Sequence, residues 1–192
     1  MNRRAFTKLI GLSGLAIGVG DVPVFARKPA PQFSITMDDF FWQNSVKLTG
    51  AERSQSILQT LNKHSIKAAL FVIGKNIEAD EGKQLLTTWD RAGHMLANHT
   101  YSHTNLNAPG ADVKAFQDDI LRAEALLKDF PRFHKYLRFP MLKEGDTVAK
   151  RDAMRAFLAE HNYRNGHVTI DTSDWYIDQR LTARLKSNPA AD

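Results

Sequence analysis

The strongest constraint on the fold is a regular alternation of short apolar runs with longer amphipathic stretches. Five apolar, β-rich runs are expected to be buried strands: 33–37, 68–73, 94–97, 136–139 and 168–170. Four stretches repeat apolar residues at steps of three and four and are expected to be helices: 51–64, 77–92, 112–130 and 147–163. Because a strand–helix–strand connection joins parallel strands, the alternation predicts an α/β fold with a parallel sheet. Periodicity alone does not decide whether this sheet is an open doubly wound sheet or a barrel.

Residues 1–26 are typical of an export signal rather than of a folded domain. A basic start that contains Arg3 and Arg4 precedes the apolar run 9–19, and Ala26 supplies a small residue at a candidate cleavage point. A run of this length is too short to cross a hydrocarbon core, which needs about 20 residues, so no stable membrane anchor is expected. The paired arginines resemble a twin-arginine signal, which predicts a periplasmic or extracellular protein. The alternative interpretation is that this N-terminal segment forms a frayed amphipathic helix.

Charge and composition exclude several classes of function. The 192 residues include 26 Lys and Arg and 21 Asp and Glu, a net charge of +5. Residues 1–26 carry three of these basic residues and one acidic residue, so the balance over 27–192 is only +3. That part has no block of basic and aromatic residues, and we expect no nucleic-acid partner. Cysteine is absent, so a metal ion would have to be held by His, Asp or Glu.

Polar and titratable side chains follow four of the five predicted strands. In chain order they are Asp38, Asp39, His99, His103, Arg138, Asp171, Asp174 and Trp175. The C-terminal ends of parallel strands meet at one edge of the sheet, where α/β proteins assemble their sites. We therefore expect these side chains to gather at that edge.

The two histidines and the two aspartates together indicate a metal site. His99 and His103 are four residues apart, so both imidazoles can face one divalent ion. Alone, such a pair is more often two surface histidines, and adjacent Asp38 and Asp39 are more often a cap or a turn. Adjacent residues that leave a strand point in opposite directions, so one carboxylate can bind the metal while the other acts as a base. Two His and one Asp with open positions are typical of a catalytic site.

Four segments resemble, in order and spacing, the first four motifs of the polysaccharide deacetylase family, also called the NodB-homology or carbohydrate esterase 4 group. They are TMDDF at 36–40, GHMLANHTYSH at 93–103, RFPML at 138–142 and DTSDW at 171–175. The resemblance covers about residues 33–180 and implies a distorted (β/α) barrel, with a deacetylase domain over 27–192. The family's fifth motif ends in a histidine that protonates the leaving amine. No histidine follows Trp175, so we expect this domain to be incomplete at its C-terminus.

The resemblance implies metal-dependent hydrolysis of acetyl groups, N-acetyl in particular, from a polysaccharide such as peptidoglycan, a chitin-like glycan or an exopolysaccharide. Asp39, His99 and His103 would hold one divalent ion, with zinc expected first and cobalt or nickel as alternatives. Asp38 would be the general base toward the attacking water, and Arg138 would keep its carboxylate ionised.

The same resemblance implies roles for three further residues. The backbone N–H of Met141 would stabilise the tetrahedral oxyanion, Asp174 would orient and tune the general-acid histidine, and Trp175 would form a wall of the sugar groove. Phe40 stands where the family usually has Gly, and Met141 where it usually has an aromatic residue. Two alternatives stay open: a metal- or glycan-binding protein without turnover on the same scaffold, and a hydrolase of a small cyclic amide or formamide.

Overall fold

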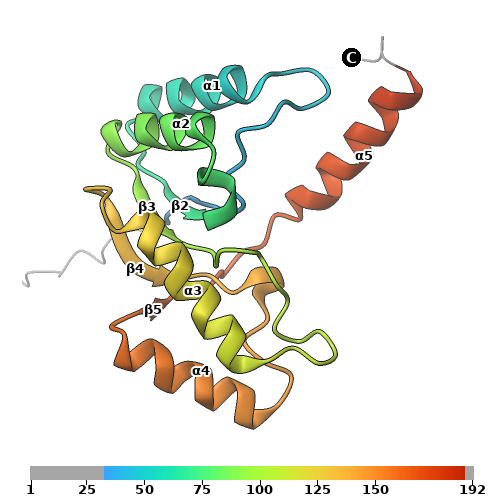
Figure 1. Cartoon of the computed structure of the whole chain (residues 1–192). Helices are drawn as coiled ribbons and strands as arrows, with labels where there is room; N and C mark the ends of the chain where they lie inside the picture. The colour runs from blue at the N-terminus through green and yellow to red at the C-terminus, as the bar shows by residue number, and fades with distance from the viewer. Residues whose placement is uncertain (1–32, 189–192) are drawn as a thin grey trace, which may run out of the picture. The chain divides into compact units, whose positions relative to one another are not determined.

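Parallel strands and α-helices alternate along the chain (Figure 1). The structure is a computed structural model that describes residues 33–188, and the predicted export signal at 1–26 lies outside the described residues. The strands are β1 Thr36–Met37, β2 Ala69–Val72, β3 Met95–Asn98, β4 Phe133–Leu137 and β5 Arg164–Asn165. The α-helices are α1 Gly50–Lys63, α2 Asp80–Arg91, α3 Val113–Leu127, α4 Val148–Glu160 and α5 Asp174–Ser187. Two short 3-10 helices are η2 Gly74–Ile77 and η3 Pro140–Leu142.

The strands form one parallel sheet in chain order, β1-β2-β3-β4-β5. Every neighbouring pair is parallel, for example with Val72 opposite Asn98 and Asn98 opposite Leu137. The predicted α/β fold with a parallel sheet is therefore confirmed. Because all strands run the same way, the residues that follow β1, β3, β4 and β5 lie at one edge of the sheet.

The fifth strand lies earlier in the chain than the sequence predicted. The prediction placed it at 168–170, whereas β5 is Arg164–Asn165 and pairs with Tyr136 and Leu137. Residues 168–170 are irregular, and Ile170 is 81% exposed. The prediction was wrong here because β propensity reflects a paired, half-buried surface. The apolar run at 168–170 has no partner strand among residues 33–188.

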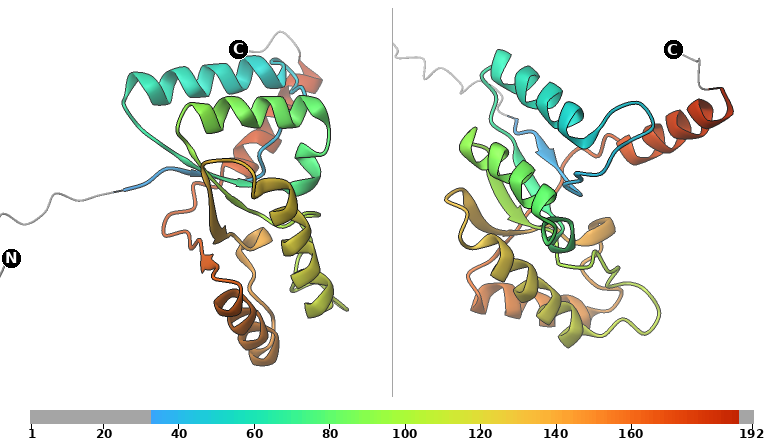
Figure 2. Two further views of the ribbon diagram at one scale, coloured as in Figure 1. Left: turned by 60° about the vertical axis from the view of Figure 1, so that its left-hand side comes forward. Right: turned by 45° about the horizontal axis from the view of Figure 1, so that its top comes forward.

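Helices α1 to α4 pack against the same face of the sheet. Leu70 of β2 packs in one cluster with Leu61 of α1 and Leu86 of α2. Leu137 of β4 lies in a second cluster with apolar residues of α3 and α4. Figure 2 shows these helices following one another around the sheet. A doubly wound sheet would have helices on both faces, so this one-sided layer favours the barrel arrangement.

The opposite face of the sheet is concave. It carries the small cluster of Ala69, Phe71 and Ala97. Arg138, at the end of β4, donates a hydrogen bond to the hydroxyl of Thr36 in β1 at 3.2 Å. In a flat sheet β1 and β4 would be three strand spacings apart, roughly 14 Å, which is farther than one side chain reaches. The sheet must therefore curl toward this face, as the wall of a barrel does.

Side-chain caps determine where several helices begin. Thr49 accepts a hydrogen bond from the backbone N–H of Glu52, whose carboxylate accepts from the backbone N–H of Thr49. This capping box satisfies two amides that the first turn of α1 leaves without intrahelical partners. At α3 and α4 the side chains of Asp112 and Thr147 each accept one hydrogen bond from a first-turn amide, without the reciprocal bond of a capping box. None of the helices described here combines the length and the hydropathy that crossing a membrane requires.

Candidate functional site

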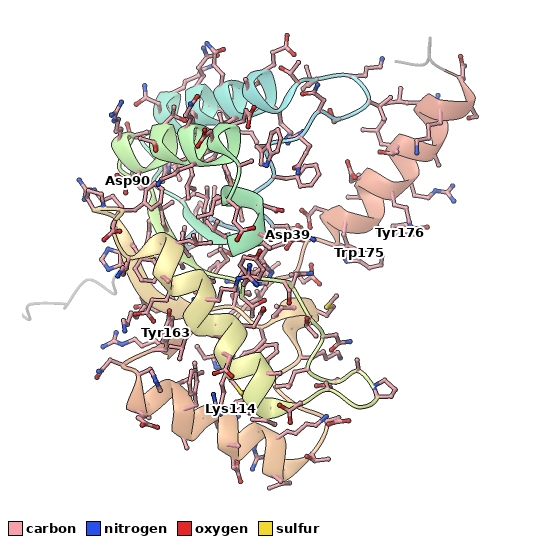
Figure 3. The ribbon with its side chains drawn as sticks, in the orientation of Figure 1. Asp39, Asp90, Lys114, Tyr163, Trp175 and Tyr176 are labelled. Atoms are coloured by element: carbon pink, nitrogen blue, oxygen red, sulfur yellow. The ribbon has the colours of Figure 1, made fainter. Side chains whose placement is uncertain are left out.

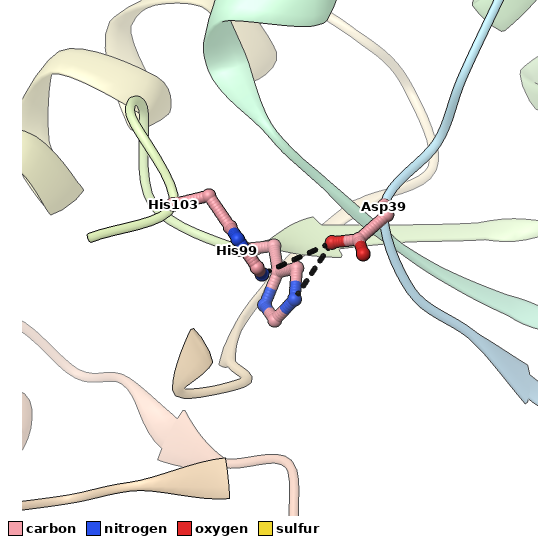
Figure 4. A group of neighbouring side chains, drawn as sticks. All are labelled: Asp39, His99 and His103. Carbon is pink, nitrogen blue, oxygen red and sulfur yellow. Dashed lines mark ion pairs between the residues drawn. The ribbon is translucent and has the colours of Figure 1, made fainter. Parts of the chain in front are cut away.

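Asp39 lies at the C-terminal edge of the sheet (Figure 3), where it meets His99 and His103 (Figure 4). Asp39 follows β1, His99 directly follows β3, and His103 lies four residues further along the same loop. Oδ1 of Asp39 is 3.2 Å from Nε2 of His99 and 3.2 Å from Nε2 of His103. The structure thus brings Asp39 to two histidines that follow it 60 and 64 positions later in the sequence.

The three donor atoms fit a single divalent ion. Ligand atoms at about 2.0–2.1 Å from a tetrahedral zinc ion are roughly 3.3 Å from one another, close to the two Asp39–His distances of 3.2 Å. All three donor atoms lie within 4.8 Å of one another. Three protein ligands leave a coordination position open, which is the arrangement of catalytic rather than structural zinc sites.

The orientation of His99 is determined by its other ring nitrogen. His99 is 2% exposed, and its Nδ1 lies 2.7 Å from the carbonyl oxygen of Arg138. A carbonyl can only accept, so Nδ1 donates to it, and Nε2 is the ring nitrogen that faces Asp39. A histidine held in this way by a backbone carbonyl is prepared to bind a metal through the opposite nitrogen.

The pKa shifts of the group match the protonation states that metal ligands need. Burial lowers the pKa of His103 below its ordinary value, although the carboxylates of Asp39 and Asp38 oppose this effect. Burial raises the pKa of Asp39, but the hydrogen bond with His99 and the positive charge that His103 and His99 carry when protonated outweigh it, so the net shift is downward. An ionised carboxylate and a neutral His103 are the states in which these two side chains can bind a cation.

Asp38 forms a charged pair with Arg138 next to this group. The Nη1 atom of Arg138 donates to Oδ1 of Asp38 at 2.7 Å, and Arg138 is 3% exposed. The guanidinium lies over the ring of Phe71 at 4.0 Å, and its Nε donates to the carbonyl of Gly166 at 2.5 Å. These partners hold the buried guanidinium in place and direct it at Asp38.

Gly166 and Phe71 complete the support of Arg138 and were not identified from the sequence. A Cβ atom on Gly166 would lie 2.5 Å from the ring of Phe71, so only glycine fits there. The N–H of Gly166 donates to the carbonyl of Leu137 at 2.7 Å, which keeps the segment after β5 beside β4. An Asn–Gly pair ordinarily signals a turn, so the pattern around Gly166 gave no hint of this role.

The segment after Arg138 contains the predicted oxyanion donor. Met141 has φ 53° and ψ 18° within η3, a left-handed backbone that is uncommon for a residue with a side chain. Asp39 also has a positive φ, 53°, at the first motif. Strained residues of this kind concentrate at functional sites.

Phe40, where the family usually has Gly, is buried, and its carbonyl accepts from Asn76 at 2.8 Å.

Asp174 and Trp175 are not joined to the Asp39 group. Asp174 begins α5, nine residues beyond the end of β5, and Trp175 is 65% exposed (Figure 3). The ring of Trp175 contacts Tyr176, with ring centroids 5.8 Å apart. Within residues 33–188 no hydrogen bond or ion pair links Asp174 or Trp175 to the metal group, so their roles stay predictions.

Comparisons with known proteins find similarity to deacetylases that are named for polysaccharide substrates. Residues 26–164 match the family model for polysaccharide deacetylase. The chain is 28% identical over 125 residues to the peptidoglycan-N-acetylglucosamine deacetylase of Bacillus cereus, covering 65% of this chain and 42% of that protein. It is 29% identical over 121 residues to the chitooligosaccharide deacetylase of Rhizobium leguminosarum bv. trifolii, covering 62% of this chain and 51% of that protein. The chain thus spans about half the length of these relatives.

Solved structures with the same fold include an enzyme and a pseudoenzyme. The chitin deacetylase of Colletotrichum lindemuthianum matches with a TM-score of 0.58 at 21% identity, over 82% of this chain and 66% of that one. A carbohydrate esterase family 4 pseudoenzyme from Bacillus anthracis matches with a TM-score of 0.60 at 19% identity, over 80% of this chain and 50% of that one. The family match covers most of the chain and includes the strands that carry Asp39, His99 and Arg138. The chain therefore belongs to the polysaccharide deacetylase family.

Proposed function

We propose that this chain is a metal-dependent hydrolase that removes acetyl groups, N-acetyl in particular, from an acetylated polysaccharide. The observation that carries the proposal is the Asp39–His99–His103 group directly beside the Asp38–Arg138 pair. A metal site next to a carboxylate held by a buried guanidinium provides both an electrophile and a base at one place. The names of the relatives, peptidoglycan-N-acetylglucosamine deacetylase and chitooligosaccharide deacetylase, support a glycan with N-acetyl groups as the substrate.

The residues of the chain would divide the chemistry as follows. Asp39, His99 and His103 would hold one divalent ion, zinc in the first place, which when bound polarises a carbonyl and lowers the pKa of water. Asp38 would accept the proton of the attacking water, and Arg138 would hold that carboxylate in place through a charge-assisted hydrogen bond. The backbone N–H of Met141, three residues after Arg138, would donate to the developing oxyanion.

We also propose that the protein acts outside the cytoplasm. The support is the sequence of residues 1–26, with its paired arginines and short apolar run. Peptidoglycan and other surface glycans lie outside the cytoplasmic membrane, so export would bring the enzyme to its substrate. A fusion of residues 1–26 to a reporter that is active only after export tests this. Loss of export in a variant with Arg3 and Arg4 both changed to Lys would support the twin-arginine type.

The test of the activity is acetate release from chitooligosaccharides and from peptidoglycan by the full chain. We expect release that a chelator stops and that added zinc, cobalt or nickel restores. His99→Ala should abolish both metal binding and acetate release, because it removes the ligand whose orientation Arg138 determines. His134→Ala, at an exposed position of β4, is the matched control and should behave as wild type. Unchanged metal stoichiometry in His99→Ala would refute the ligand assignment.

A second candidate is a metal- or glycan-binding protein without turnover. The observation that favours it is that a pseudoenzyme shares the fold. The same experiment separates the two candidates. Metal-dependent acetate release establishes the hydrolase, whereas metal and glycan binding without acetate release establishes the binding protein.

A further inference from the structure

The loop that carries both histidines has an unfavourable backbone conformation. Thr100 has φ 63° and His103 has φ 60°, both in the left-handed region that residues with side chains rarely occupy. Such conformations persist only where the surrounding structure holds them in place. The backbone of residues 99–103 must therefore be held by specific partners if His103 is to stay near Asp39.

Asp119 of α3 holds the middle of this loop. Its Oδ2 atom accepts from the backbone N–H of Tyr101 at 3.0 Å and from the backbone N–H of Ser102 at 2.9 Å. The same oxygen accepts from the hydroxyl of Ser102 at 3.0 Å. Hydrogen bonds to an ionised carboxylate are stronger than neutral ones. One side chain thus restrains the two residues that precede His103.

The other amides of the loop have neutral partners. The N–H of Thr100 donates to Oδ1 of Asn98 at 2.8 Å, and the N–H of His103 donates to the hydroxyl of Thr100 at 3.0 Å. The N–H of His99 donates to the carbonyl of Val72 at 3.0 Å. Within residues 33–188, Asp119 is the only charged side chain that bonds the backbone of this loop. Its contribution is therefore separable from the rest of the hydrogen-bond network.

The place of Asp119 is determined by the core. Ile120, the next residue, is fully buried, and its carbonyl accepts from the side-chain amide of Asn98 at 2.9 Å. Asn98 immediately precedes His99 in the chain. Helix α3 is thus fixed to the end of β3 at the position where Asp119 reaches over the loop, whereas its neighbour Asp118 is exposed and pairs with Lys114.

We propose that Asp119 is a positioning residue for the metal centre: it clamps the 101–102 backbone so that the imidazole of His103 stays within reach of Asp39 and His99. The inference rests on the proposed metal-dependent function and adds to it a residue outside the ligand set. Partners that orient metal ligands typically change metal affinity by 10–100-fold when they are removed.

The experiment compares wild type with Asp119→Asn, Asp119→Ala and the control Asp118→Asn. Two quantities are measured on the full chain: amide hydrogen exchange of Tyr101 and Ser102 in the metal-free protein, and Co²⁺ affinity from the absorption spectrum of bound Co²⁺. Asp119→Asn keeps the size of the side chain and one acceptor oxygen but loses the charge, so it remains interpretable if Asp119→Ala does not fold.

We expect faster exchange at both amides and Co²⁺ affinity lower by about 10-fold in Asp119→Ala, with Asp119→Asn intermediate and Asp118→Asn as wild type. Wild-type exchange and wild-type Co²⁺ affinity in Asp119→Asn and Asp119→Ala would overturn the inference. Failure of the wild-type chain itself to bind Co²⁺ is a different result. It would overturn the proposed metal-dependent function and, with it, the role of Asp119 in positioning a metal ligand.

Discussion

At the scale of single residues, two neighbouring carboxylates have different surroundings. Asp39 faces the two histidines at 3.2 Å, whereas Asp38 faces Arg138 at 2.7 Å. The positive φ of Asp39 contributes to this divergence, because it turns the backbone between the two side chains. One carboxylate is thereby placed to bind a cation and the other to move a proton.

Asp38→Asn tests this division of roles. The amide keeps the size of the side chain but cannot accept a proton, so acetate release should fall by about 10²–10⁴-fold, the usual contribution of a general base. Metal binding should be retained, because the donor atoms of Asp39, His99 and His103 are untouched. Metal content and acetate release are measured on the same preparation, with exposed Asp178→Asn as the control. Loss of the metal in Asp38→Asn would show that Asp38 is itself a ligand.

At the scale of elements, the support of Arg138 depends on how closely β5 and the chain after it approach β2. The carbonyl of Gly166 accepts from Arg138, and Phe71 of β2 lies under the guanidinium. The space between Gly166 and Phe71 admits no Cβ atom. Strand β2 and the segment after β5, which are not neighbours in the sheet, thus share one buried cation, and this couples the packing of the concave face to the charge beside Asp38.

Gly166→Ala is expected to destabilise the protein by about 1–3 kcal/mol, the usual range for a side chain forced into a filled space. Denaturant unfolding of wild type and variant measures the change. The double variant Gly166→Ala with Phe71→Leu relieves the contact. Its loss of unfolding free energy should therefore be smaller than the sum of the losses in the two single variants. Strictly additive effects would contradict a direct clash between these residues.

At the scale of the whole molecule, His94 joins the start of β3 to β2 and α2. Its Nδ1 accepts from the backbone N–H of Ala68 at 3.0 Å, and its ring packs edge-on to Trp89. Burial, and secondly the charge of Lys67, lowers the pKa of His94 below its ordinary value. The folded protein therefore holds His94 neutral, and protonation would remove the acceptor that Ala68 uses.

This predicts a pH dependence of global stability. Below about pH 6.5, the ordinary pKa of histidine, the unfolded chain binds a proton at His94 that the folded chain does not. The free energy of unfolding should therefore fall as the pH falls from about 6.5 until the lowered pKa of the folded state is reached. In His94→Asn, whose side-chain oxygen can accept from Ala68 without titrating, this part of the fall should disappear. Parallel pH profiles for wild type and variant would contradict the prediction.

Local patterns in the sequence were enough to predict the alternation of strands and helices and the residues that form the candidate site. The alternation of apolar runs predicted a parallel α/β sheet, and the aspartates, histidines and arginine that follow its strands included the five residues that now lie together. The tertiary structure decided the rest, because it depends on contacts between distant segments. Only three-dimensional packing reveals the barrel-like curvature that lets Arg138 reach Thr36, β5 at 164–165 in place of 168–170, and the roles of Gly166 and Asp119.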